Sequence, residues 1–149
     1  MNSIFDQKDN HHLIERIKKL NPQTQGLWGK MNVSQMMAHL QEPLLVMTGE
    51  KTIKFTLWGR FFGKYLKNKF IKNRGFGKNL LTHEKFKVVD AKQFQNEQEK
   101  LINTMLIIQQ QGTNVITKNK HPFFGNITHQ EWADLMYLHI NHHLNQFGV

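Results

Sequence analysis

Apolar residues recur at helical spacing in four stretches of the chain. The first stretch covers about residues 10–20 and ends at Pro22, because a proline disfavours a helical conformation in the residue before it. The second stretch begins after Asn32, which fits a capping box with Gln35 three residues later, and it ends at Gly49. Both segments therefore predict amphipathic helices with one apolar face.

The third stretch covers about residues 91–111, with Asp90 as the expected cap and Gly112 as the closing residue.

Pro43 falls inside the second stretch. A proline has no N–H to donate to the carbonyl of residue 39, so we expect a kink at this point. Residue 39 is a histidine, and the distortion would lie beside it.

The fourth helix has the clearest start, because Thr128 and Glu131 fit a capping box, and it runs to about Gln146. Residues 48–90 connect the second and third stretches and include a shorter amphipathic helix at Leu57–Lys72. We assign the aromatic residues to one side of this helix and the basic residues to the other: Trp58, Phe61, Phe62, Tyr65 and Leu66 against Arg60, Lys64, Lys67 and Lys72. No strand is predicted.

These elements predict an all-α fold with a single domain spanning residues 1–149. Four main helices and a long connection fit a four-helix bundle with one crossover, which carries the extra short helix. The 39% hydrophobic content suffices for one core, and no stretch approaches the roughly 18 apolar residues that span a bilayer. The sequence has no cysteine and no signal-peptide pattern at its start, so we expect a cytoplasmic protein.

The net charge of +9 is concentrated in the connection between helices. Residues 51–87 contain 11 Lys and Arg against one acid, Glu84, whereas the rest of the chain has 9 basic and 10 acidic residues. Any argument for an acidic partner therefore concerns residues 51–87, in which aromatic and basic residues alternate.

Three of the nine histidines form a candidate metal site. His139 and His143 are four residues apart on the apolar face of the last helix, so their side chains lie one turn apart. His39 lies close to the apolar face of the second helix, and three imidazoles suit zinc and similar metals with a position left open. On the pattern alone, hydrogen-bonded core histidines are the simpler interpretation. His142 could orient a ligand or substrate, or be a solvated surface residue.

Two segments, WGKMNVSQMMAHL at residues 28–40 and HPFFGNITHQEWADLMYLHINHHLNQFGV at 121–149, resemble the DinB/YfiT-like superfamily. The resemblance implies an up-down-down-up four-helix bundle. It also implies a nickel, zinc or similar ion held by one histidine of the second helix and an i, i+4 pair of the last. Those positions correspond here to His39, His139 and His143, and the family's His-His-x-x-Gln ending corresponds to His142, His143 and Gln146.

The resemblance suggests metal-dependent transfer or isomerisation with low-molecular-weight thiols, or hydrolysis, on a small-molecule substrate. We therefore expect a metalloenzyme in which the ion activates a bound water or thiol. Glu42 is one turn after His39 and is a candidate general base, although a solvated acid is the simpler interpretation. Arg60, Lys64 or Arg74 could receive the carboxylates of an anionic thiol. A homodimer is a further expectation by family analogy.

Two alternatives stay open. Residues 51–87 could make the chain a non-catalytic module that binds nucleic acid or an anionic membrane. We favour the simpler interpretation, in which the aromatic residues pack onto the bundle and the lysines are solvated, and we do not expect nucleic-acid binding. Alternatively, the metal could be purely structural, although structural sites usually have four protein ligands.

Overall fold

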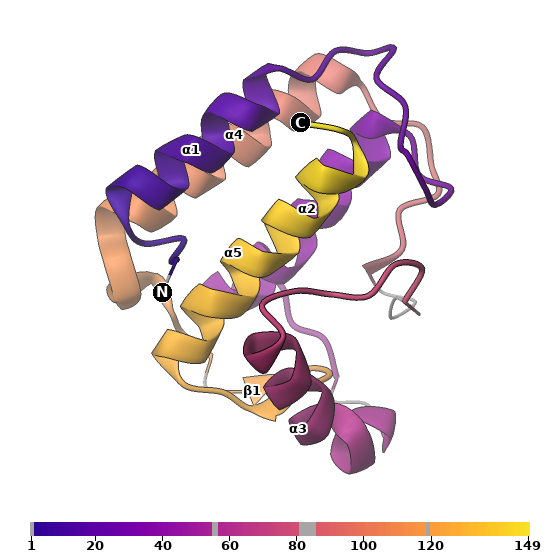
Figure 1. Cartoon of the computed structure of the whole chain (residues 1–149). Helices are drawn as coiled ribbons and strands as arrows, with labels where there is room; N and C mark the ends of the chain where they lie inside the picture. Colours follow the sequence, from indigo (N-terminus) through magenta and orange to yellow (C-terminus); the bar gives the residue numbers. More distant parts are fainter. Residues whose placement is uncertain (1, 55–56, 81–85, 119) are drawn as a thin grey trace.

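The computed structural model describes residues 2–54, 57–80, 86–118 and 120–149; the side chains of residues 57, 58 and 60 are not described. The described chain is mostly helical, as predicted (Figure 1). The elements, in chain order, are α1 (Gln7–Lys18), α2 (Val33–Thr48), α3 (Leu57–Lys72), α4 (Phe94–Gln111), the 3₁₀ helix η2 (Gly112–Val115), β1 (Lys120–His121), β2 (Gly125–Asn126) and α5 (His129–Gln146).

The strands β1 and β2 form an antiparallel pair that the sequence analysis did not predict. Each strand has only two residues, too few for an alternating pattern to show in the sequence. The turn between them contains Phe123 and Phe124, whose N–H groups point at His121 Nδ1, 3.1 and 3.2 Å away. A buried histidine therefore holds this hairpin closed.

Both predicted capping boxes are confirmed. At α2 the Asn32 and Gln35 side chains each accept from the other's backbone N–H, and at α5 Thr128 and Glu131 do the same. Gly49 ends α2 in the left-handed region at φ 85°, where a side chain would be strained. These signals fix the ends of the two helices that carry the three candidate ligands.

Two predicted starts were wrong. The first helix begins at Gln7 and not near residue 10, because Asp6 caps it by accepting from the Asp9 N–H at 2.9 Å. Asp90 does not cap α4, since Lys92 lies 2.8 Å from its carboxylate and Gln93 occupies the cap position without a side-chain bond. Local hydrogen bonds and ion pairs decided both starts.

Four of the helices surround the core. In the described chain α4 packs against α1 and α2, and α5 packs against the same two helices on the other side (Figure 1). Arg16 of α1 donates to the end of α5, at 2.6 Å to Asn141 Oδ1 and 2.8 Å to Asn145 Oδ1. The α2 helix continues through Pro43. The α2–α5 contact is the one that matters for the candidate site.

The α3 helix packs on β2 and α5 through an unexpected face. Gly63 lies so close to the hairpin that an added Cβ would stand 2.2 Å from the Phe123 carbonyl oxygen. Lys67, which we had assigned to the solvated side, is only 6% exposed. Its ammonium donates to Asn126 O at 2.8 Å and pairs with Glu131 at 2.7 Å. Because the Lys67 amine has these two partners, its burial is tolerated.

The aromatic side of α3 faces outward. Phe61 is 74% exposed and Tyr65 is 65% exposed, so the expectation that the aromatic residues of 51–87 pack onto the bundle was wrong for these two. The physical reason is that the close approach at Gly63 and the Lys67 ion pair direct the opposite face of the helix inward. The expectation is confirmed for Phe70 and Phe86, which are buried in the core. None of the described helices is long and apolar enough to cross a membrane.

Candidate metal centre

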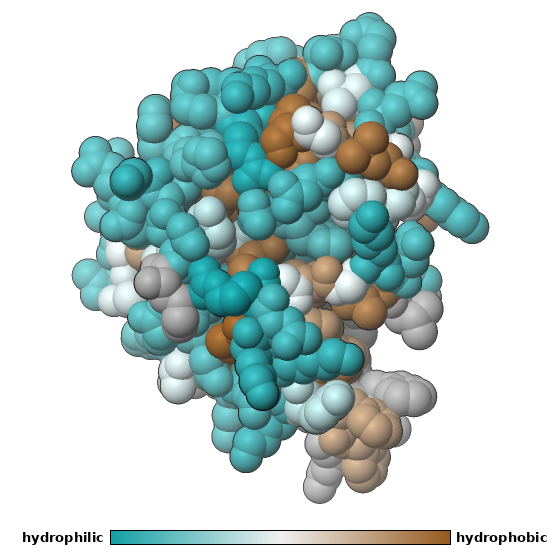
Figure 2. All heavy atoms as spheres, in the orientation of Figure 1, coloured by the Kyte–Doolittle hydropathy of each residue, from teal (hydrophilic) through white to brown (hydrophobic). Residues whose placement is uncertain are grey.

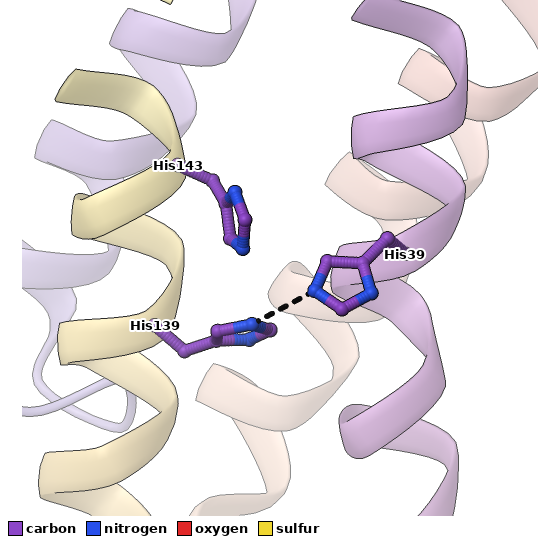
Figure 3. Close-up of side chains that lie close together, drawn as sticks. All are labelled: His39, His139 and His143. Carbon is purple, nitrogen blue, oxygen red and sulfur yellow. Dashed lines mark hydrogen bonds between the residues drawn. The ribbon is translucent and has the colours of Figure 1, made fainter. Parts of the chain in front are cut away.

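Three imidazoles converge between α2 and α5. His39 comes from α2, while His139 and His143 come from successive turns of α5, and Figure 3 shows the three rings turned toward one another. One ring nitrogen from each histidine lies within 4.8 Å of the others, close enough to share a metal ion. The Nε2 atoms of His39 and His139 are 3.1 Å apart. The i, i+4 spacing predicted the common face of His139 and His143, and the family resemblance implied His39 as the third ligand.

Fixed acceptors orient two of the rings. His39 Nδ1 lies 2.8 Å from the Phe86 carbonyl oxygen, and His143 Nδ1 lies 2.7 Å from Gln146 Oε1. Because an oxygen can only accept here, we assign the proton of each ring to Nδ1. Each Nε2 lone pair then faces the shared centre, which is the arrangement in which metal-binding histidines are usually held.

The size of the cluster fits a small divalent ion. Zinc–nitrogen bonds of about 2.0–2.1 Å in a tetrahedral site place ligand nitrogens roughly 3.3 Å apart. The closest pair here is 3.1 Å apart and the whole set lies within 4.8 Å, so small side-chain shifts would suffice. Three nitrogens leave at least one position open for water or a substrate, as catalytic sites require.

Burial keeps the cluster neutral. Burial lowers the pKa of His39. It also lowers the pKa of His139, and the neighbouring imidazoles lower that pKa further because they oppose a second positive charge. The pKa of His143 is lowered to about 3, mainly by burial and then by the proximity of His39. Neutral imidazole is the form that binds a metal, so the site has its ligands ready at neutral pH.

Aromatic residues and a lysine lie beside the cluster, around His142. The His142 ring centre lies 5.1 Å from that of His143 and 5.8 Å from that of Trp28, and burial lowers the pKa of His142. Phe76 lies edge-on to His139 at 5.7 Å. Lys78 Nζ stands 4.4 Å above the Trp28 ring, a cation–π contact. An ammonium and two aromatic rings thus lie beside the partly buried face of the site.

In the described part of the chain, the candidate general base and the candidate carboxylate receptors form no hydrogen bond with the three histidines. Glu42, one turn after His39, forms an ion pair with Lys51. Arg74 donates to Asn2 Oδ1 at 3.0 Å, and Lys64 is exposed on α3. The side chain of Arg60 lies outside the described residues. Their proposed roles as base and carboxylate receptors stay predictions.

The residues that orient the cluster differ in how far the sequence reveals them. The Phe86 carbonyl could not be found, because a backbone acceptor leaves no side-chain signal. Gln146, 3% exposed, joins His143 to the Trp28 carbonyl, which it reaches through Nε2 at 2.6 Å. The resemblance had matched Gln146 to the His-His-x-x-Gln ending, and its place three residues after His143, on the same helix face, accounts for the contact. Among the described residues, His121 is a further buried histidine, and its contacts lie in the hairpin.

Comparison with known proteins gives one result. The sequence model of the family described as "Protein of unknown function (DUF1569)" matches residues 4–148, nearly the whole chain. Searches of the curated proteins and of the solved structures find no match. The chain therefore belongs to the DUF1569 family.

Proposed function

We propose that this protein is a metal-dependent enzyme with a DinB/YfiT-like four-helix arrangement and with His39, His139 and His143 as ligands. Nickel and zinc are the preferred ions, since both suit three imidazoles. The reaction class is transfer or isomerisation dependent on a low-molecular-weight thiol, or hydrolysis. A cytoplasmic location and a homodimer remain predictions.

One observation supports the proposal above the others. The Nδ1 atoms of His39 and His143 are both engaged by oxygen acceptors from outside the cluster, which leaves Nε2 to face the centre. Hydrogen-bonded core histidines would also take such acceptors, but they would not need one ring nitrogen from each of three rings gathered within 4.8 Å. The two polar contacts that hold this orientation are of the kind that metal-binding histidines usually make.

The surrounding residues suit a small anionic substrate. A bound divalent ion supplies a Lewis acid that lowers the pKa of a coordinated water or thiol. Lys78 offers a positive charge for a carboxylate, and Trp28 and Phe76 provide apolar ring surface near His142. His142, neutral because burial lowers its pKa, offers a nitrogen that can hold a proton of the substrate.

Metal content tests the site directly. Elemental analysis should find about one nickel, zinc or related ion per chain in the wild-type protein, and strongly reduced content in His143→Ala. His12→Ala is the matched control, since His12 is exposed on α1 and should keep the metal. Equal metal content in wild type and His143→Ala would refute the site.

Turnover tests the chemistry separately. The metal-loaded protein would be assayed with a thiol such as bacillithiol or glutathione and a panel of electrophiles and esters, beside Lys78→Gln. We expect a raised KM for anionic substrates in Lys78→Gln with metal content unchanged. Absence of turnover across the panel by a fully loaded protein would contradict the enzymatic proposal while leaving the site intact.

A further inference from the structure

The α3 helix leaves two aromatic side chains, Phe61 and Tyr65, largely exposed to solvent. Its inward face consists of Gly59, Gly63, Lys67 and Phe70, all buried and repeated at helical spacing. Two of these are glycines and one is a lysine, so the helix is held by close backbone approach and an ion pair. Phe70 adds an apolar contact with the core, whereas the aromatic residues Phe61 and Tyr65 take no place on this inward face and stay exposed.

The opposite face has a defined composition. Helical spacing places Phe61, Tyr65 and Lys72 directly opposite the buried inward face. Lys64 and Lys69 flank these three residues, one on each side. All five side chains are exposed. In Figure 1 α3 lies at one end of the molecule, beyond the other helices, and Figure 2 shows hydrophobic surface at that end. We call these five residues the α3 face.

This composition is typical of a helix lying on a bilayer surface. Aromatic side chains enter the boundary between headgroups and acyl chains, while lysines beside them contact anionic headgroups. The surrounding charge favours the same partner, because residues 51–87 contain 11 basic residues and one acid. Charge complementarity thus points to a surface rich in negative charge.

We propose that the α3 face docks on an anionic lipid bilayer, with Phe61 and Tyr65 inserted and Lys64, Lys69 and Lys72 at the headgroups. A second copy of the chain is disfavoured, because a symmetric contact through this face would bring two lysine-rich helices together. Single-stranded nucleic acid is disfavoured, because its binders stack bases along a groove and the α3 face is a protruding helix surface.

Vesicle binding of the full-length chain tests the proposal. Vesicles of phosphatidylcholine with phosphatidylserine should retain the protein at about 0.15 M salt, and vesicles of phosphatidylcholine alone should not. The double substitution Lys64→Gln with Lys72→Gln should weaken binding about 30-fold. The pair Phe61→Ser with Tyr65→Ser should weaken it at least about tenfold.

A matched control changes apolar surface elsewhere. Leu106→Ser with Ile107→Ser removes two exposed apolar side chains from α4, so it should leave vesicle binding unchanged. Circular dichroism melting of each variant checks that the fold is retained. Because α3 residues 61, 64, 65 and 72 lie on its solvent side, these substitutions should leave the packed face intact.

Three results would overturn the proposal. The first is failure of the wild-type chain to bind anionic vesicles at that salt concentration. The second is vesicle binding that survives Phe61→Ser with Tyr65→Ser. The third is tight binding of single-stranded DNA, or a concentration-dependent dimer, that those same two substitutions abolish. Metal content is unaffected in every case, so this proposal and the enzymatic one fail separately.

Discussion

Gln146 links the candidate metal centre to the segment that precedes α2. Its Oε1 accepts from His143 Nδ1 at 2.7 Å and its Nε2 donates to the Trp28 carbonyl at 2.6 Å. Gly29 lies beside it at φ +85°, and a Cβ there would stand 2.4 Å from Gln146 Nε2. The amide is therefore clamped from both ends, and we expect it to set the orientation of His143.

Replacing Gln146 by Leu keeps the approximate volume and removes both hydrogen bonds. His143 Nδ1–H and the Trp28 carbonyl each lose a partner in a buried site, so unfolding should become easier by about 2–4 kcal/mol. Loss of a partner that orients a ligand typically weakens metal affinity about 10–100-fold. Gln146→Glu keeps an acceptor for His143, but its second oxygen would face the Trp28 carbonyl oxygen, so its affinity should lie between that of Gln146→Leu and that of the wild type.

The assay is competition for zinc or nickel against a chromophoric chelator, with melting curves recorded on the same samples. Gln110→Leu, an exposed glutamine on α4, is the control and should behave as wild type. The reasoning is refuted if folded Gln146→Leu binds metal as tightly as the wild type. It is also refuted if Gln146→Glu is as weak as Gln146→Leu, because the acceptor would then be irrelevant.

Three further predictions concern stability, each checked by urea unfolding of the metal-free protein. Stability should fall as the pH drops from about 6.5 toward 3, by about 1.4 kcal/mol per unit for His143, because its folded-state pKa is lowered to about 3 and the unfolded chain binds the proton first. His143→Asn should flatten this slope, and an unchanged slope would contradict the assignment. Lys67→Ala should cost about 2 kcal/mol by leaving Glu131 unpaired; no loss would show that the ion pair is unimportant. Gly63→Ala should cost about 1–3 kcal/mol, because its methyl group meets the Phe123 carbonyl, and wild-type stability would refute that contact.

The helices that hold the candidate ligands were the most predictable part of the chain. Capping boxes at Asn32 and Thr128 are local signals, since each is complete within four residues and the bonds form whatever the rest of the fold does. Once both helices are fixed, the i, i+4 spacing of His139 and His143 determines their common face. The pairing with His39 needed the family resemblance, because nothing in the sequence states that α2 lies against α5.

The orientation of α3 could not be predicted from its amphipathic pattern. The pattern correctly gave the helix bounds, and it wrongly placed Lys67 outside and Phe61 and Tyr65 inside. What decided the orientation was a distant carboxylate, Glu131, already fixed by its capping box and able to pair with a buried amine. Such a partner is 64 residues away in the sequence, so local periodicity contains no trace of it.

Chelation alone will not separate a catalytic metal from a structural one. An ion shared by His39 and His139 joins residues 100 positions apart, and closing so long a loop stabilises the folded chain whatever the ion does chemically. A lower melting temperature after chelation is therefore expected under both interpretations. The distinction depends on the side chains next to the cluster, His142, Trp28 and Phe76, since a structural site would have no use for an open position. Substitution of Phe76 by Ala should leave the melting shift on chelation largely intact and alter KM; an altered melting shift with no change in turnover would favour the structural interpretation.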